Sequence, residues 1–194
     1  MRVPLMSGAI SKGSFVSLRN IESEDLERIS EFAYTVSIIE PLTDIDQLRK
    51  VFEQTKLWLE EKGAVSILEN TSGRMIGTLQ YYRASPCIHG LEIGYIIHNQ
   101  SNRNKGFAAE ALRLLSDHLF FTSSHFQRQQ LLIEVWNTAS WKVAERCGFI
   151  REGIMRSGGF GTDPADEFIY SRTIRDYREE KSSNNGALSE MTKT

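Results

Sequence analysis

The segment from Leu91 to Trp136 constrains the fold more than any other part of the chain. Its pattern predicts a strand at 91–97, a polar loop at 98–105, a helix at 106–121 and a strand at 130–136. One face of the helix is apolar and carries Ala108, Ala111, Leu112, Leu115 and Leu119. A strand, a helix and a second strand in one sheet require a right-handed crossover, so the two strands run parallel. We expect a ligand beyond the carboxyl end of the first strand, in the loop after Ile97.

Shorter elements on either side complete the domain. Strands are predicted at 15–19, 64–68, 75–82, 149–156 and 167–174, and helices after a cap at Ser23, from Thr43 or Asp44 to a stop at Gly63, and at 138–147. We therefore expect an α/β (α+β) fold with a mixed, mostly antiparallel central sheet of about seven strands and about four flanking helices. Residues 1–13 are expected to form an N-terminal arm, 14–177 a single domain, and 178–194 a disordered tail.

Composition excludes several functional classes. The 194 residues carry a formal net charge of -2, which gives no general attraction to nucleic acid or to an anionic membrane. No stretch approaches the ~20 apolar residues of a membrane span, and residues 1–10 lack the apolar run of a signal peptide. Cys87 and Cys147 form no CxxC pair, and the four histidines lack metal-ligand spacing. We therefore expect no disulfide framework, no metal and a cytoplasmic location.

The run Arg103-Asn104-Lys105-Gly106 lies where the polar loop meets the long helix. Backbone N–H groups at a helix start have no partner within the helix, and the helix dipole favours an anion there. Gly106 permits close approach of a phosphate, while Arg103 and Lys105 add positive charge. The run therefore predicts a diphosphate site, although it is neither a P-loop nor a dinucleotide fingerprint. The alternative is a solvated basic loop with an ordinary glycine at the helix start.

A second candidate run, N-x-x-S-x-x-V-A-E-x-C-G-F, extends from Asn137 to Phe149. Ser140 shares a helix face with Ala144 and Cys147, so a hydroxyl leads an otherwise apolar stripe. A buried hydroxyl needs a hydrogen-bond partner, which makes Ser140 a candidate functional residue. The alternative is that Asn137 is simply an N-cap and Ser140 an ordinary first-turn residue.

Together the two runs resemble the GNAT acetyltransferases. The first reads R-x-x-G-x-A-x-E-A over 103–111, and the second follows at the expected separation. Further family-like positions are Leu18-Arg19, Ile76-Gly77, Glu92-Ile93-Gly94-Tyr95, Glu152-Gly153 and Asp176-Tyr177. Within the family the chain is most similar to the RimJ/RimL type, which acetylates N-terminal amines of ribosomal proteins. The resemblance covers about residues 14–177 and implies a GNAT-like sheet whose parallel fourth and fifth strands splay apart.

The resemblance also implies acetyl-CoA as the co-substrate. The backbone amides that would hold its diphosphate belong to Arg103, Asn104, Lys105, Gly106, Phe107 and Ala108. The pantetheine arm would lie between the splayed strands and bond to main-chain groups near Ile96 and Ile97, as an added strand does. Asn137 would bond the pantetheine, and Ser140 would lie near the sulfur. Asn104 departs from the family pattern because glycine is common there, and the loop from Ile97 to Gly106 is one residue longer than usual.

Glu92 is the candidate general base, acting through a water, for direct attack of a neutral amine on the thioester in a ternary complex. On a strand its side chain shares a face with Gly94 and Ile96. The alternative role for Glu92 is a cross-strand ion pair with an arginine. Ser140 is the candidate donor to the departing thiolate. An α-amine with a pKa of about 8 is neutral near pH 7 far more often than a lysine with a pKa of about 10.4, which favours a protein N-terminus as acceptor.

Three functions remain open from the sequence. They are a RimJ/RimL-like N-acetyltransferase, an acetyltransferase of a small-molecule amine such as an antibiotic, toxin or metabolite, and a non-catalytic acyl-CoA sensor. The expected partner is an amine, with neither nucleic acid nor membrane, in a monomer or homodimer. His98 in the cofactor loop is expected either to touch substrate or to be solvated. The glycine-rich residues 158–161 form either a lid over the acceptor or a long hairpin connection.

Overall fold

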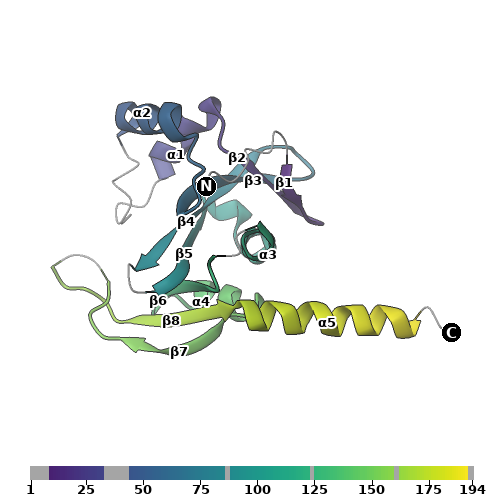
Figure 1. Ribbon diagram of the computed structural model, residues 1–194. Coiled ribbons are helices and arrows are strands. Elements are labelled where there is room, and N and C mark those ends of the chain that lie inside the picture. Colours follow the sequence, from purple (N-terminus) through teal and green to yellow (C-terminus); the bar gives the residue numbers. More distant parts are fainter. Residues whose placement is uncertain (1–8, 33–43, 86–87, 123–124, 160–161, 192–194) are drawn as a thin grey trace.

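The computed structural model describes residues 9–32, 44–85, 88–122, 125–159 and 162–191 (Figure 1). In these ranges eight strands form one sheet in the order β1-β2-β3-β4-β5-β6-β8-β7. The strands are β1 (Ala9–Lys12), β2 (Val16–Asn20), β3 (Lys62–Glu69), β4 (Met75–Ser85), β5 (Ile88–Ile97), β6 (Arg128–Glu134), β7 (Ile150–Met155) and β8 (Glu167–Thr173). The helices are α1 (Leu26–Phe32), α2 (Ile45–Thr55), α3 (Phe107–Thr122), α4 (Thr138–Arg146) and α5 (Ile174–Met191), with 3-10 turns at Ser23–Asp25 and Gln100–Asn102.

The parallel pair β5 and β6 shapes the molecule. Every other pair of neighbouring strands is antiparallel. β5 and β6 pair only at Gly90 with Arg128, Leu91 with Gln129, and Glu92 with Gln130. Beyond that point β5 continues beside β4 and β6 continues beside β8, so the sheet opens into a V (Figure 1). The predicted mixed sheet with a splayed parallel pair is therefore confirmed.

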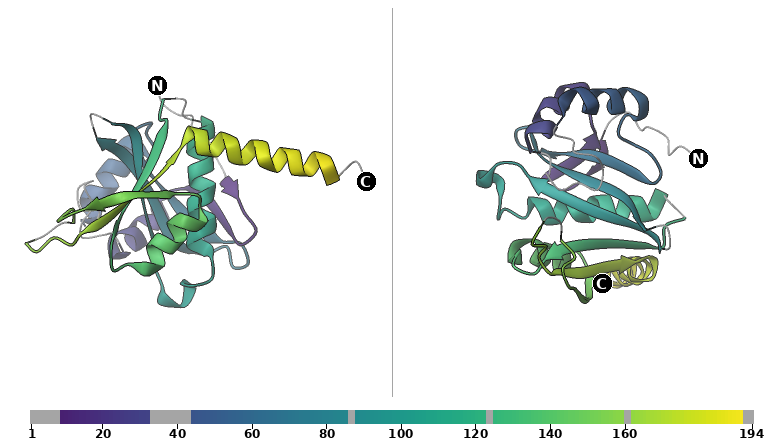
Figure 2. Two further views of the ribbon diagram at one scale, coloured as in Figure 1. Left: turned by 90° about the horizontal axis from the view of Figure 1, so that it is seen from below. Right: turned by 90° about the vertical axis from the view of Figure 1, so that its left-hand side faces the viewer.

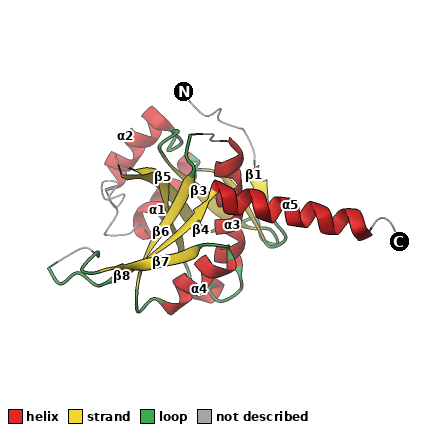
Figure 3. Cartoon of the chain, turned by 60° about the horizontal axis from the view of Figure 1, so that its bottom comes forward, coloured by secondary structure: helices red, strands yellow, loops and turns green. Residues whose placement is uncertain are grey.

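The helices cover the two faces of the sheet unequally. The main core joins Ala111, Leu112 and Leu115 of α3 to Leu91, Ile93, Leu131 and Ile133 of the sheet. A second core cluster contains Ile21, Leu26, Ile29, Leu48 and Ala64, which places α1 and α2 against each other and against β3. Figures 2 and 3 show this division, with α1 and α2 set apart from α3 and α5 by the strands. Because side chains alternate along a strand, Glu92 points away from the face that α3 covers.

The structure differs from the predictions at three places near the N-terminus. Residues 9–12, expected in an arm, form β1 and pair with β2, which raises the predicted seven strands to eight. The first helical segment is capped by Glu22 and not by Ser23, because the Glu22 N–H donates to the Asp25 carboxylate at 2.9 Å. α2 ends at Thr55 and does not reach Gly63, because Lys56 and the residue after it adopt positive φ angles of 54° and 52°.

The chain beyond Arg178 is helical through Met191, where the sequence predicts a disordered tail. Its polar composition offers no apolar stripe that would signal a docked helix. The helix instead begins with a polar cap, since the Asp176 carboxylate accepts hydrogen bonds at 2.7 Å from both the N–H and the hydroxyl of Thr173. α5 is the longest described helix, yet neither it nor any other helix of the described ranges is long and apolar enough to cross a membrane.

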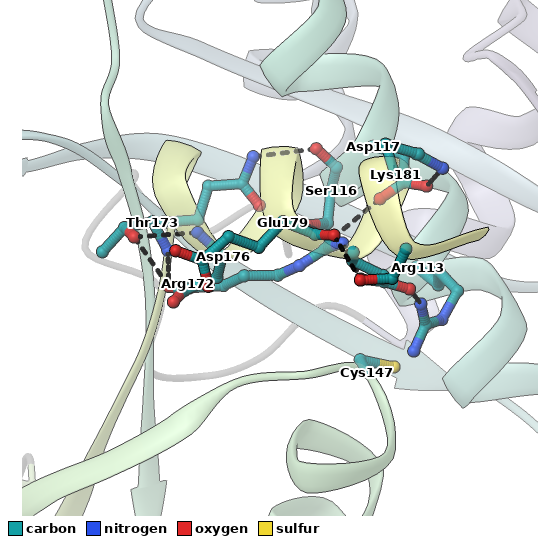
Figure 4. Close-up of polar contacts among 12 residues, drawn as sticks. Arg113, Ser116, Asp117, Cys147, Arg172, Thr173, Asp176, Glu179 and Lys181 are labelled. Atoms are coloured by element: carbon teal, nitrogen blue, oxygen red, sulfur yellow. Dashed lines mark hydrogen bonds and ion pairs between the residues drawn. The ribbon is translucent and has the colours of Figure 1, made fainter. Parts of the chain in front are cut away.

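Ion pairs centred on Arg172 fasten α5 to α3. Arg172 is the penultimate residue of β8 and is fully buried. One guanidinium nitrogen donates to Asp117 and to Ser116 of α3, each at 2.7 Å (Figure 4). The other donates to Glu180 of α5 at 2.7 Å. Lys181 adds a bond to Asp117 at 2.8 Å. Ion pairs, and not an apolar helix face, therefore attach α5 to the domain. This explains why the hydrophobic pattern of the sequence did not predict the helix.

Replacing Glu180 with glutamine is expected to destabilise this junction. Glu180 accepts hydrogen bonds from the buried Arg172 and from Arg113 of α3. The amide keeps the shape but leaves the buried guanidinium with one carboxylate fewer, so we expect a loss of about 2 kcal/mol in the free energy of unfolding. Urea titration measures the loss, with the exposed neighbour Glu179→Gln as the matched control. Equal losses in the two variants would show that the Arg172 network does not hold α5.

Candidate active site

The start of α3 presents backbone N–H groups to the outside of the fold. Asn104 and Gly106 adopt positive φ angles of 60° and 83°, and the first helical bond runs from the Glu110 N–H to the Gly106 carbonyl at 3.0 Å. No described residue accepts a hydrogen bond from the backbone N–H groups of residues 104–109. Alternation of positive and negative φ turns successive N–H groups toward one concavity, which is an anion-binding nest. Open space around Gly106 leaves this concavity accessible.

Glu110 lies in the first turn of α3 but does not fill the helix end. Its carboxylate accepts three backbone hydrogen bonds from the N-terminal segment, from Ser14 at 2.7 Å, Phe15 at 2.8 Å and Val16 at 2.7 Å. Gly13 lies directly beside it, and a Cβ there would lie 2.4 Å from the Glu110 carboxyl carbon, so any larger residue would displace the carboxylate. The acidic residue of the first turn thus anchors the entry to β2 and leaves the amides at the helix start available.

Two cations flank these amides. The Arg103 Nε donates to the Ile97 carbonyl at 3.3 Å, which ties the loop to the end of β5, and the Lys105 ammonium lies 5.8 Å from the centre of the Phe107 ring. Asn104 tolerates its left-handed backbone better than most residues, which explains how it stands where the resembling family has glycine. The nest, the helix dipole and the two exposed cations fit the diphosphate of a coenzyme A.

The gap between β5 and β6 begins directly beyond Glu92. The side chain of Glu92 is buried, with 7% of its surface exposed. One carboxylate oxygen accepts a hydrogen bond from the Tyr82 hydroxyl, and the other accepts one from the Gln130 amide at 2.9 Å. Burial and then the charge of Glu92 raise the pKa of Tyr82, so its hydroxyl stays protonated and acts as the donor. Among the described residues Glu92 forms no ion pair with an arginine.

Ser140 lies at the start of α4, on the other side of the sheet from Glu92. Asn137 is the N-cap of α4, and its side-chain oxygen accepts from the Ser140 N–H at 3.2 Å. The Ser140 hydroxyl is 2.8 Å from the hydroxyl of Tyr95 in β5, and the same tyrosine hydroxyl donates to the Ser140 carbonyl at 3.1 Å. Alternation along β5 places Tyr95 on the α3 face and Glu92 on the opposite face. Two polar centres therefore border the gap, one on each face.

The end of β5 leaves main-chain groups next to the gap. A Cβ on Gly77 of β4 would lie 2.3 Å from the Ile96 carbonyl, so β4 approaches this end of β5 unusually closely. On its other side β5 pairs with no described strand beyond Glu92, which leaves Ile96 and Ile97 beside the opening. Peptide groups on an open strand edge pair readily with an extended ligand. The predicted contact of these two residues with a pantetheine arm stays a prediction.

Two other titratable groups near the site are neutral at pH 7. The Cys147 thiol donates to the Ala109 carbonyl at 3.1 Å, and burial raises its pKa to about 11, so it is no nucleophile. Burial and then the charge of Arg28 lower the pKa of His98 to about 4. His98 is 4% exposed, so the prediction of a solvated loop histidine is wrong.

Sequence reasoning missed the partners of the candidate residues. Tyr95 lies within the run Glu92-Ile93-Gly94-Tyr95, but the sequence does not indicate that it contacts Ser140. The sequence also does not identify Tyr82 or Gln130 as partners of Glu92, because both contacts depend on the register between neighbouring strands.

The predicted glycine-rich lid at 158–161 lies partly outside the described residues. Its described part forms a hydrogen bond from the Gly159 N–H to the Ala165 carbonyl at 3.0 Å. No three His, Cys, Asp or Glu side chains of the described ranges are grouped to hold a metal ion.

Comparison with known proteins places this geometry in a family. Residues 16–150 match the family model described as an acetyltransferase (GNAT) domain. The uncharacterized N-acetyltransferase p20 of Bacillus licheniformis is 30% identical over 148 residues, which cover 73% of this chain and 82% of that protein. The ribosomal-protein-serine acetyltransferase of Escherichia coli K12 is 33% identical over 101 residues, which cover 52% of this chain and 55% of that protein. A spermidine N-acetyltransferase from Vibrio cholerae shares the fold, with a TM-score of 0.71 at 21% identity over 85% of this chain and 97% of that one.

Proposed function

The chain belongs to the GNAT acetyltransferase family, and we propose that it transfers the acetyl group of acetyl-CoA to a primary amine by direct attack in a ternary complex. The observation that carries the proposal is the alignment of three features. Unbonded amides open α3, the gap between β5 and β6 begins beyond Glu92 and widens toward the end of β5, from which the loop leads to those amides, and polar residues border that gap on both faces. A coenzyme bound by the amides would reach Ser140 on one face and present its acyl end to Glu92 on the other.

Acetyl-CoA, when bound, supplies the acetyl group as a thioester. The residues of the chain then have three tasks. Amides of 104–108 hold the diphosphate, and main-chain groups of Ile96 and Ile97 orient the pantetheine arm. The Asn137 side-chain amide nitrogen, which donates to no described residue, bonds to the same arm. A backbone N–H at the end of β5 stabilises the oxyanion that develops on the carbonyl.

Proton movement assigns the remaining roles. When the carbon–nitrogen bond forms and the carbon–sulfur bond breaks, the amine must lose a proton and the thiolate must gain one. Glu92 accepts the first through a water, because it is an acceptor whose present bonds come from a hydroxyl and an amide and not from a competing cation. Ser140 donates a proton to the thiolate, and the Tyr95 hydroxyl, 2.8 Å away, passes a proton from solvent to Ser140, so that neither hydroxyl is left charged.

The acceptor is a protein N-terminal α-amine or a small-molecule amine. The pKa argument and the ribosomal-protein-serine acetyltransferase among the relatives favour the first. The fold shared with a spermidine N-acetyltransferase favours the second. Acetyl-CoA should be incubated with free and blocked N-terminal peptides and with amines, and thiol release should be measured. Release that depends on a free amine supports the proposal. Acetyl-CoA binding with no amine-dependent release would instead indicate a non-catalytic acyl-CoA sensor.

A further inference from the structure

Glu167, the first residue of β8, is a buried carboxylate without a described partner. Its side chain is 8% exposed. The Oε2 atom is shielded from solvent and forms no hydrogen bond with any residue of the described ranges. Leaving a charged group buried and unbonded opposes folding, so such a group is rare unless something else binds it.

The sheet brings two more carboxylates to the same face. Glu167 lies directly opposite Glu134 of β6, and Gln130 of β6 lies opposite Ser171 of β8. Alternation therefore places the side chains of Glu134 and Glu167 on the face of Gln130, whose amide binds Glu92 at 2.9 Å. Like charges directly opposite on neighbouring strands destabilise a sheet. None of the ion pairs among the described residues includes Glu92, Glu134 or Glu167.

The electrostatics agree with this grouping. Burial raises the pKa of Glu167, and the charges of Glu92 and Glu134 raise it further. The pKa of Tyr82 is raised by burial, then by Glu92, and also by Glu167, so Tyr82 lies close enough to both carboxylates to be affected by their charges. The start of the β7–β8 loop closes over Glu167, since a Cβ on Gly158 would lie 3.0 Å from its Oε2. A cation placed among these groups would reduce their mutual repulsion.

We propose that Glu167 binds a second positive charge of the acceptor, so that the preferred substrates are amines with another cationic group near the reacting nitrogen. The inference rests on the proposed acetyl transfer and adds its substrate class. Glu92 serves the nitrogen that is acetylated at the gap. Glu167, farther along the same face, holds the cationic group that does not react. Glu167 is thus a residue that sets specificity.

A pair of amines of equal length tests the proposal. Putrescine and butylamine share a four-carbon chain, but only putrescine has a second ammonium group. In the unaltered protein we expect kcat/KM for putrescine to exceed that for butylamine by about tenfold or more, the usual strength of a hydrogen bond to a charged group. Glu167→Gln should remove most of this ratio, whereas Glu53→Gln, at an exposed position on α2, should leave it unchanged. A ratio that survives in Glu167→Gln would overturn the inference.

Stability gives a readout that does not need turnover. A carboxyl whose pKa is raised by folding favours the folded state at low pH and loses that contribution as pH rises through its folded value. Glu167→Gln should therefore match the unaltered protein below about pH 4.3, where the carboxyl is protonated in both states, and be more stable at neutral pH. Glu92, Glu134 and Tyr82 are the groups grouped with this carboxyl on the same face, and the substitution leaves all three residues in place. A variant less stable at neutral pH would identify Glu167 as a structural residue and contradict the inference.

Thermal stabilisation by putrescine separates this inference from the proposed function. If no amine is acetylated, the proposed function fails, yet putrescine should still raise the melting temperature of the unaltered protein and not that of Glu167→Gln. If amines are acetylated and putrescine stabilises both proteins equally, the function stands and the role of Glu167 is wrong.

Discussion

Glu92→Gln is expected to lower turnover by about 100-fold or more while leaving the affinity for acetyl-CoA unchanged. The glutamine keeps the size of the side chain and still accepts a bond from the Tyr82 hydroxyl, and the Gln130 amide can rotate to meet it. What is lost is the proton acceptor beside the gap. The deficit should be steepest at low pH, since at higher pH the amine has already given its proton to solvent. Steady-state kinetics across pH measure the effect.

The control for this variant is Glu69→Gln. Glu69 is likewise a strand carboxylate, but it ends β3, and among the described residues its side chain accepts a hydrogen bond from the Ser72 hydroxyl in the hairpin turn. Its replacement should leave turnover within a factor of about two, as surface substitutions usually do. Unchanged turnover of Glu92→Gln at every pH would remove Glu92 from the mechanism and leave proximity as the source of the rate.

Gly106→Val is expected to weaken acetyl-CoA binding by at least about 100-fold, because it disrupts several charge-assisted hydrogen bonds together. Gly106 has a φ of 83°, which a β-branched residue adopts only with strain. No described residue lies within 4 Å of a Cβ at this position, so the side chain would occupy the space that a phosphate needs. Calorimetric titration with acetyl-CoA measures the affinity.

Gly73→Val separates strain from binding. Gly73 has a φ of 66° and equally open surroundings, but it lies in the hairpin between β3 and β4. Both variants should lose a similar amount of stability, and only Gly106→Val should lose affinity for acetyl-CoA. Equal affinities in the two variants would mean that the start of α3 does not hold the coenzyme.

Local patterns in the sequence were sufficient to predict most of the fold. Helical spacing in α3 and the apolar run of β5 fix a parallel crossover, and this crossover defines where the sheet can open. The opening itself came from the family resemblance, since periodicity carries no information on where two strands stop pairing. α5 was missed because its attachment depends on Arg172 and its carboxylate partners, which lie on three different elements.

The candidate site also combines features that local sequence predicts with features that depend on distant contacts. The run around Gly106 predicts the exposed amides because helix ends obey local rules. The other contacts of the site depend on the register between strands. The contact of Tyr82 with Glu92 and the position of Glu167 opposite Glu134 both follow from pairing between segments that are distant in the sequence. Glu110 is a further case, since its backbone partners are 94 to 96 residues away. Contacts of this kind cannot be read from spacing in one segment.

A crystal structure with bound coenzyme A tests the central claim most directly. We expect the diphosphate oxygens within hydrogen-bond distance of the backbone nitrogens of 104–108, and the pantetheine arm between β5 and β6 beyond Glu92. A coenzyme bound elsewhere, or β5 and β6 paired along their full length in the complex, would contradict the account.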